Sequence, residues 1–248
     1  MASTHSYSID LLVKHYFVCF CILGVGYNVL SRVFKIKDTK AHWYFLHSLA
    51  NAYICSVTIY DVFNVFMEPE YALFRPIDLP PINYSNSIMI GALHIFHLVM
   101  YWKDITRDDL FHHLLFVTFN QCAQFYPILS GWKVYQWGSS LNAINFFTCG
   151  LPGGLDYFFL GLTKIGKMQR LTHKRLQAVI NVWLRCPGIF SSVSISLFES
   201  YRNYKNVPFS GVVIAHVCFV LIGYNAIHYM ERVVLSAGRN LKDFKGTS

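Results

Sequence analysis

The chain has 248 residues, of which 54% are hydrophobic and only 14% are charged, and this is more apolar surface than one soluble core of that length needs. The composition therefore predicts a polytopic membrane protein, an all-α transmembrane helix bundle that forms a single domain over residues 1–248. The formal net charge of +8 does not indicate a nucleic-acid partner, because most Lys and Arg residues lie in short connectors between apolar segments.

The apolar residues form blocks of about 18 to 25 residues, the length that a helix needs to cross a bilayer. We expect seven crossings, at about residues 11–32, 42–66, 87–102, 109–126, 135–163, 176–198 and 209–232. The fifth is longer than one crossing and contains GLPGG at residues 150–154. Because proline removes a backbone donor and glycine permits a break, we expect one helix broken at GLPGG, with its backbone lining a cavity. Residues 67–86 are rich in proline and predict a non-helical loop that contains a glycosylation sequon at Asn83.

The distribution of basic residues predicts the orientation in the membrane. With seven crossings and a luminal N-terminus, the cytosolic connectors and the C-terminal tail carry fifteen Lys and Arg residues, and the opposite side carries four. Cytosolic loops are enriched in Lys and Arg, so we expect a luminal N-terminus and a cytosolic C-terminus.

The third and fourth segments form a hairpin that carries four histidines, His94, His97, His112 and His113. Ionisable residues are rare inside a bilayer and mark functional sites by default. Adjacent residues point about 100° apart on a helix, so we expect one of His112 and His113 to face the bundle interior. A neutral imidazole there would act as general base or nucleophile in acyl transfer, which makes both histidines catalytic candidates.

Two carboxylates are candidates for orienting this histidine, in the way that a carboxylate orients a catalytic imidazole. Asp61 lies near the end of the second segment, and Asp156 follows GLPGG directly. The candidate substrate-binding residues lie near the predicted cytosolic face, where basic side chains would attract the phosphates of acyl-CoA. They are His47, His94, His97, Lys103 and Arg107.

Several of these segments resemble the TLC domain shared by ceramide synthases, TRAM proteins and CLN8-like proteins. The resemblance covers about residues 40–235 and rests on LHSLANAY, on the aspartate at the far end of that segment, on the histidines of the third segment, and above all on KDITRDDLFHH. It places His112 and His113 on the histidine pair of the family, with Asp108 or Asp109 near the aspartate that precedes it. Ceramide synthases also carry a His-Asp pair and a further aspartate in the following segment, where this chain has only Asp156.

The resemblance implies an endoplasmic reticulum protein that acts on membrane lipids, with acyl-CoA as a co-substrate and no bound cofactor. The departure from the synthase pattern leaves a second interpretation open, a non-catalytic lipid-binding or structural subunit that works with other membrane proteins. A third is a metal enzyme, since His94 and His97 share a helix face and one or both of His112 and His113 could complete a site. Desaturase-type histidine boxes have other spacings, so no metal ligand is assigned.

Overall fold

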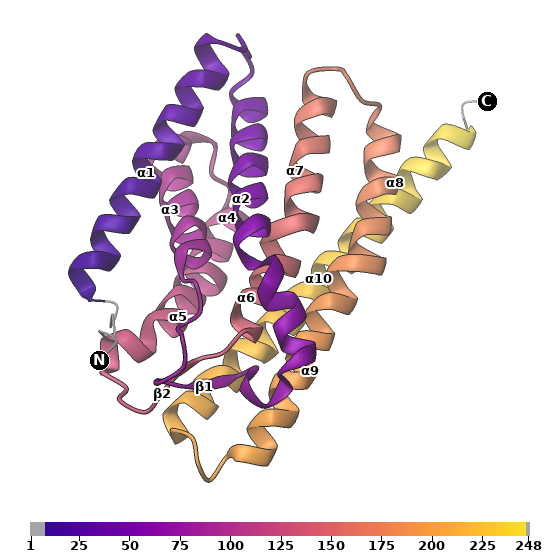
Figure 1. Ribbon diagram of the computed structural model, residues 1–248. Coiled ribbons are helices and arrows are strands. Elements are labelled where there is room, and N and C mark those ends of the chain that lie inside the picture. The colour runs from indigo at the N-terminus through magenta and orange to yellow at the C-terminus, as the bar shows by residue number, and fades with distance from the viewer. Residues whose placement is uncertain (1–7, 247–248) are drawn as a thin grey trace.

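The computed structural model describes residues 8–246, without the side chains of residues 104, 108, 109, 115, 116 and 240–246. It is a bundle of long helices with one short two-stranded sheet (Figure 1). In chain order its elements are α1 (Ile9–Arg32), α2 (Thr39–Met67), the 3₁₀ turn η1 (Pro69–Tyr71), β1 (Phe74–Pro76), α3 (Ser85–Met100), the 3₁₀ turn η2 (Trp102–Asp104), α4 (Arg107–Phe111), η3 (His112–Thr118), α5 (Phe119–Ser130), β2 (Tyr135–Trp137), α6 (Ser140–Asn145), η4 (Phe146–Gly150), α7 (Leu151–Lys164), α8 (Arg170–Ile180), η5 (Asn181–Arg185), α9 (Cys186–Asn203) and α10 (Phe209–Gly246).

The helices begin and end where the local sequence supplies caps. The Ser8 hydroxyl accepts from the Leu11 amide at the start of α1, and the Asp38 carboxylate accepts from the Ala41 amide at the start of α2. Each cap satisfies a first-turn N–H that has no partner within its helix. The α5 helix ends at Gly131, whose φ of 68° is left-handed, a conformation that glycine adopts without steric cost.

The α2 helix lies at the centre of the bundle. It packs against α1 and α3 on one side and against α6 and α7 on the other, and α10 packs against α8 and α9 (Figure 1). A hydrophobic cluster around Trp43, Leu46 and Phe96 fills the space between α1, α2 and α3. A second cluster, which includes Phe125 and Ile189, fills the other end of the bundle. A third, small cluster contains Val65, Ala72 and Ala143, and together these clusters join the helices of the described residues into one body.

Three helices contain a π-helical segment, in which each turn holds one extra residue. These segments are η3, between α4 and α5; η4, between α6 and α7; and η5, between α8 and α9. The break predicted at GLPGG was wrong, because the chain stays helical through residues 150–154. Helix continues from Ser140 to Lys164, but π-helix changes to α-helix at Gly150, whose ψ of −109° lies outside the helical range. Pro152 fits there because the first turn of a helix does not use its N–H groups.

The loop predicted at residues 67–86 is largely non-helical, as expected. It contains η1 and β1, and β1 pairs antiparallel with β2, with Phe74 opposite Trp137. The expected start of the fifth segment at residue 135 was wrong, because residues 135–137 form β2 and the helix begins at Ser140. The buried Glu199 carboxylate of α9 accepts from the backbone amides of Leu73 and Phe74, which anchors β1.

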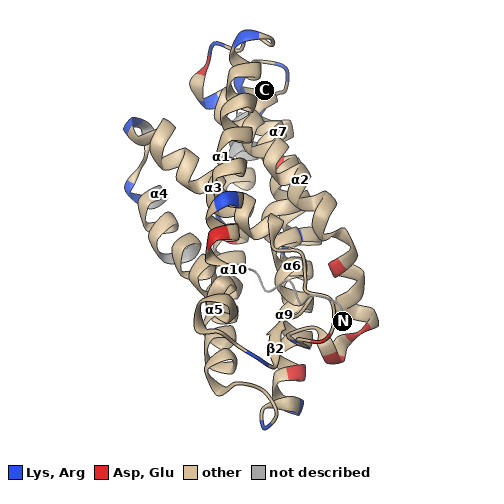
Figure 2. Cartoon of the chain, turned by 60° about the vertical axis from the view of Figure 1, so that its left-hand side comes forward, with Lys and Arg blue, Asp and Glu red and all other residues tan. Residues whose placement is uncertain are grey.

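Four helices in the described part of the chain are long and apolar enough to cross a membrane. They are α1, α2, residues 170–203 and residues 209–239 of α10. The α3 helix is apolar but has 16 residues, and residues 107–130 and 140–164 carry polar side chains such as Gln124 and Asn145. The chain is thus a helical membrane protein, and the count of seven crossings stays a prediction. Lys and Arg gather where α1 leads into α2 and also lie beside α4 (Figure 2).

Candidate functional site

Five of the histidines predicted to be functional surround one cavity. This cavity, here called the outer cavity, has a volume of about 400 Å³ and lies between α2, α3, η3 and α7. Lys40 and Thr106 lie at its wall, and both are exposed. The histidines that line it are His47 from α2, His94 and His97 from α3, and His112 and His113 from η3. The hairpin predicted from the sequence therefore closes as expected, and α2 adds a fifth imidazole.

Two of these histidines hydrogen-bond to each other across the hairpin. Nδ1 of His97 lies 3.1 Å from Nε2 of His113, and His113 is only 5% exposed. One face of the His97 ring stacks on Trp43, with the ring centroids 4.0 Å apart. This stacking and the hydrogen bond hold the His97 ring in place between α2 and η3, in the wall of the outer cavity.

The surroundings of His94 determine which of its two ring nitrogens carries the proton. Its Nδ1 lies 2.7 Å from the carbonyl oxygen of Ile90, which can only accept, so Nδ1 carries the proton. The neutral ring then has its lone pair on Nε2. The ring centroid of His94 lies 5.0 Å from that of His113 and 5.9 Å from that of His112. His94 is therefore oriented to accept a proton at Nε2 within the cluster.

His47 completes the group from α2. Its ring stacks on Tyr157 of α7 at 3.7 Å between centroids, and it is 6% exposed. Its Nδ1 is buried and has no hydrogen-bond partner among the described residues. A buried nitrogen without a partner is unusual in folded proteins and is typical of a site that a ligand or water completes.

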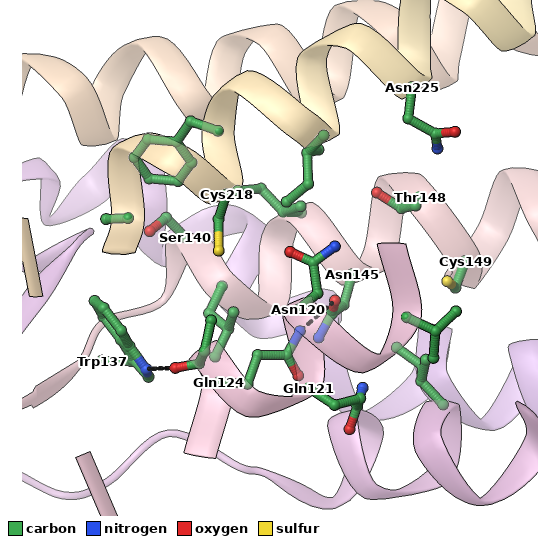
Figure 3. Close-up of a pocket in the computed structure, with 18 of the residues that line it drawn as sticks. Asn120, Gln121, Gln124, Trp137, Ser140, Asn145, Thr148, Cys149, Cys218 and Asn225 are labelled. Atoms are coloured by element: carbon green, nitrogen blue, oxygen red, sulfur yellow. Dashed lines mark hydrogen bonds between the residues drawn. The ribbon is translucent and has the colours of Figure 1, made fainter. Parts of the chain in front are cut away.

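A second cavity, here called the inner cavity, is lined by residues such as Gln124, Asn145 and Cys218 (Figure 3). It has a volume of about 120 Å³, and its walls come mainly from α5, α6, η4 and α10. Most of its lining is apolar, with amide side chains such as Gln124 and Asn145 at a few points. His94 and His112 line both cavities. These two imidazoles thus lie at the boundary between a polar outer space and an apolar inner one.

The structure places Asp156 in a different cluster from the histidine hairpin. Asp156 is 2% exposed, and His173 Nε2 lies 3.1 Å from Oδ1. Gln177 and Tyr229 donate to Oδ2 at 2.9 Å and 2.8 Å. The carboxylate therefore joins α7, α8 and α10. It lines neither cavity, although its neighbour Tyr157 contacts His47.

Asp61 also lies away from the histidines. Along α2 it follows His47 by fourteen residues, which corresponds to roughly 21 Å at the rise of an α-helix. Its Oδ2 accepts from Asn142 Nδ2 at 2.7 Å. Neither predicted carboxylate lines the outer cavity with His112 and His113. His113 instead contacts His97 Nδ1, and Ile90 orients a different histidine, His94.

The predicted basic residues lie on the segment that connects α3 to η3. Lys103 and Arg107 are exposed and are close in sequence to Thr106, which lines the outer cavity. Lys40 of α2 lines the cavity itself. The side chains of Asp108 and Asp109 lie outside the described residues. Within the described part, no group of three or more His, Cys, Asp or Glu side chains has an arrangement suited to a metal ion.

Sequence reasoning missed several residues that shape the site. Trp43 and Tyr157 stack on the histidines, and both carried only the general signal of aromatic richness. His173 and Gln177 hold Asp156, and their spacing of four on α8 places them on one helix face. That spacing predicts that His173 and Gln177 share a helix face. It does not by itself show that they bind a carboxylate on another helix.

Comparisons of the chain with protein-family models, with curated proteins and with solved structures find no match.

Proposed function

We propose that this protein is a TLC-type membrane enzyme of the endoplasmic reticulum that transfers an acyl chain from acyl-CoA to the amine or hydroxyl group of a membrane lipid. One observation carries the proposal: His94 and His112 line both the polar outer cavity and the apolar inner cavity. A lipid substrate needs an apolar space for its chain and a polar space for its reacting group. The two imidazoles lie where those spaces meet.

The chemistry follows from the orientation of His94. Its unprotonated Nε2 takes the proton of the lipid hydroxyl or amine as that group attacks the thioester carbonyl. A carbon–oxygen or carbon–nitrogen bond forms, the carbon–sulfur bond breaks, and the thiol of CoA leaves with a proton returned from the imidazole. His112 supports this step as a neighbouring imidazole on the same boundary, and His113 and His97 position the group through their hydrogen bond.

The proposed topology is compatible with this reaction. With seven crossings and a cytosolic C-terminus, the outer cavity opens at the cytosolic end, where Lys40, Lys103 and Arg107 are exposed. Their charges would raise the local concentration of the anionic acyl-CoA. The soluble co-substrate would then enter from the cytosol while the lipid enters from the membrane.

The decisive experiment is acyl transfer by purified protein in lipid nanodiscs. Labelled acyl-CoA is supplied with lipids that bear a free hydroxyl or amine, and lipid products are separated by mass. His94→Ala and His112→Ala should each lower turnover by at least about 100-fold, the contribution of general base catalysis. His216→Ala is the matched control, because His216 is exposed and bonds the Val212 carbonyl as His94 bonds that of Ile90. Turnover that is equal in all variants would refute the proposal.

A non-catalytic lipid-binding subunit is the alternative outcome of the same experiment. Such a protein would retain a lipid in the two cavities through purification but would release no CoA. Extraction of the purified protein and mass spectrometry of its lipids, together with the transfer assay, therefore separate the two functions.

A further inference from the structure

A line of buried amide side chains from α6, α3 and α5 leads to the inner cavity. Its members are between 0% and 6% exposed, and each one hydrogen-bonds to the next. In order, the line contains Asn142, Asn86, Asn145 and Gln124. Buried amides without a functional reason are costly in an apolar core, and a connected series of four calls for an explanation.

The hydrogen-bond direction along this line is fixed at the end near Asn83. The backbone carbonyl of Asn83 can only accept, so Asn86 and Asn142 both turn their Nδ2 toward it, at 2.7 Å and 3.1 Å. The side-chain oxygen of Asn142 then accepts from Asn86 at 2.8 Å, and the oxygen of Asn86 accepts from Asn145 at 2.7 Å. The oxygen of Asn145 accepts from Gln124 Nε2 at 3.5 Å.

The last oxygen in the line has no partner within the described residues. It is Oε1 of Gln124, a residue that is 6% exposed and that lines the inner cavity (Figure 3). The hydroxyl of Thr148, on the facing wall, is likewise buried without a hydrogen-bond partner. The Gln124 amide is oriented by the contact of its Nε2 with Asn145, which at 3.5 Å is the longest in the line. In this orientation the open atom is Oε1, and an amide oxygen only accepts. A molecule that completes this wall must therefore donate a hydrogen bond.

The remaining wall of the inner cavity restricts the ligand further. None of its lining residues is Asp, Glu, Lys or Arg, so a charged group would be buried there without a counter-ion. Apolar side chains such as Val117, Ile144 and Ile214 make up most of the surface. With a volume of about 120 Å³, the cavity thus suits a short stretch of hydrocarbon chain that carries one neutral donor.

We infer that the inner cavity binds the hydroxyl-bearing stretch of the hydrocarbon chain of a lipid substrate, with the rest of the chain outside this cavity, and that this hydroxyl donates to Gln124 Oε1. The inference deepens the proposed function by naming the class of chain that reaches His94 and His112. It rests on the proposed function for the fate of the bound lipid, whereas the binding itself depends only on the inner cavity.

The test is a binding competition with purified full-length protein in detergent. Octadecanoic acids with a hydroxyl in the first, middle or last third of the chain compete with a tritiated octadecanoic acid, and the unsubstituted acid is the reference. One hydroxylated isomer should bind at least about tenfold more tightly than the reference, the effect of one well-placed buried hydrogen bond. Equal affinity of all isomers, as expected if only water completes Gln124, would overturn the inference.

Two variants locate the effect. Gln124→Met keeps the length of the side chain and removes the acceptor, so the preference should disappear while the unsubstituted acid still binds. Gln121→Met is the matched control, because Gln121 lines the same cavity but its oxygen already accepts from Tyr16 at 2.8 Å. A preference that survives Gln124→Met would contradict the inference.

A third variant covers the case in which Gln124→Met does not fold. Cys218→Phe enters the inner cavity from α10 and leaves the amide line intact, so it should abolish binding of both acids. In the unaltered chain, a photoreactive group beside the hydroxyl should label peptides of α5 or α6, and labelling elsewhere would oppose the assignment. Selective binding without acyl transfer would refute the proposed function alone, whereas transfer without selectivity would refute this inference alone.

Discussion

The imidazoles of His97 and His113 hydrogen-bond at 3.1 Å, and this contact ties the last turn of α3 to η3. A π-helical segment is rare and is often found at functional sites. The contact with α3 and the stacking of His97 on Trp43 therefore hold η3, and with it His112, at the wall of the outer cavity.

Replacement of His97 by Phe should remove the hydrogen bond that holds η3 and should keep the stacking on Trp43. His97→Phe preserves the stacking on Trp43 and removes the hydrogen bond, so we expect a loss of about 0.5–1.5 kcal/mol in the free energy of unfolding. Turnover in the transfer assay should fall with it. His97→Gln supplies an amide that can bond His113, and it should restore part of both. Thermal unfolding of the two variants in nanodiscs measures the first effect, and equal unfolding of His97→Phe and the unaltered protein would show that the contact is unimportant.

The Asp156 cluster predicts a loss of stability rather than of chemistry. Asp156→Ala leaves His173, Gln177 and Tyr229 without their shared acceptor, and removal of one partner from a buried polar cluster costs about 3–5 kcal/mol. Asp156→Asn retains one oxygen and should cost less. Both losses are measured by thermal unfolding in the presence and absence of lipid.

The activity of the folded Asp156→Asn protein separates the two roles of this residue. If the carboxylate only joins α7, α8 and α10, transfer per folded molecule should stay within about twofold of the unaltered protein, well below the effect of a lost catalytic group. A stable Asp156→Asn protein that has lost turnover would instead support the catalytic role expected from the sequence.

The helices were predictable because a membrane helix must be long and apolar, and both its length and its hydropathy can be read from the sequence. The π-helical segments were not, since η3 and η5 carry no proline or glycine, and their extra residue is absorbed by packing against neighbouring helices. The predicted break at GLPGG does not occur, although the change from π-helix to α-helix lies there, and η4 packs against α2.

The histidine hairpin was predictable for a similar reason. Four histidines at the ends of two consecutive apolar runs must lie near each other once those runs pair as antiparallel helices. The partner of Asp61 and one partner of Asp156 could not be found in this way, because they lie on helices that are distant in sequence, whereas His173 and Gln177 lie on α8, the helix that follows Asp156. Asp61 bonds Asn142, eighty-one residues later, and Asp156 bonds Tyr229, seventy-three residues later.

Gly138 provides a test of the way in which β2 is joined to the bundle. A methyl group at this position would collide with the backbone oxygens of Tyr71 and Ala72, and backbone cannot move aside as a side chain does. Gly138→Ala should therefore lower the free energy of unfolding by about 1–3 kcal/mol, the usual cost of overpacking. Gly24→Ala is the control, because Gly24 lies in α1 with no atom within 4 Å of the added methyl group. The control should be neutral or stabilising by up to about 1 kcal/mol, as expected for alanine within a helix. Similar unfolding curves for the two variants would contradict the close packing at Gly138.

The predicted orientation can be tested with cysteines in two exposed connectors. Lys167 lies between α7 and α8, and Lys205 lies between α9 and α10, and both side chains are exposed. One transmembrane passage separates these connectors if residues 170–203 cross the bilayer, as their length and hydropathy allow. In sealed microsomes, a membrane-impermeant maleimide should label Lys167→Cys and should leave Lys205→Cys unlabelled until detergent is added. The unaltered chain corrects for its seven native cysteines. Labelling of Lys205→Cys alone in sealed vesicles would invert the topology, and the outer cavity would then open away from the cytosolic acyl-CoA that the proposed reaction requires.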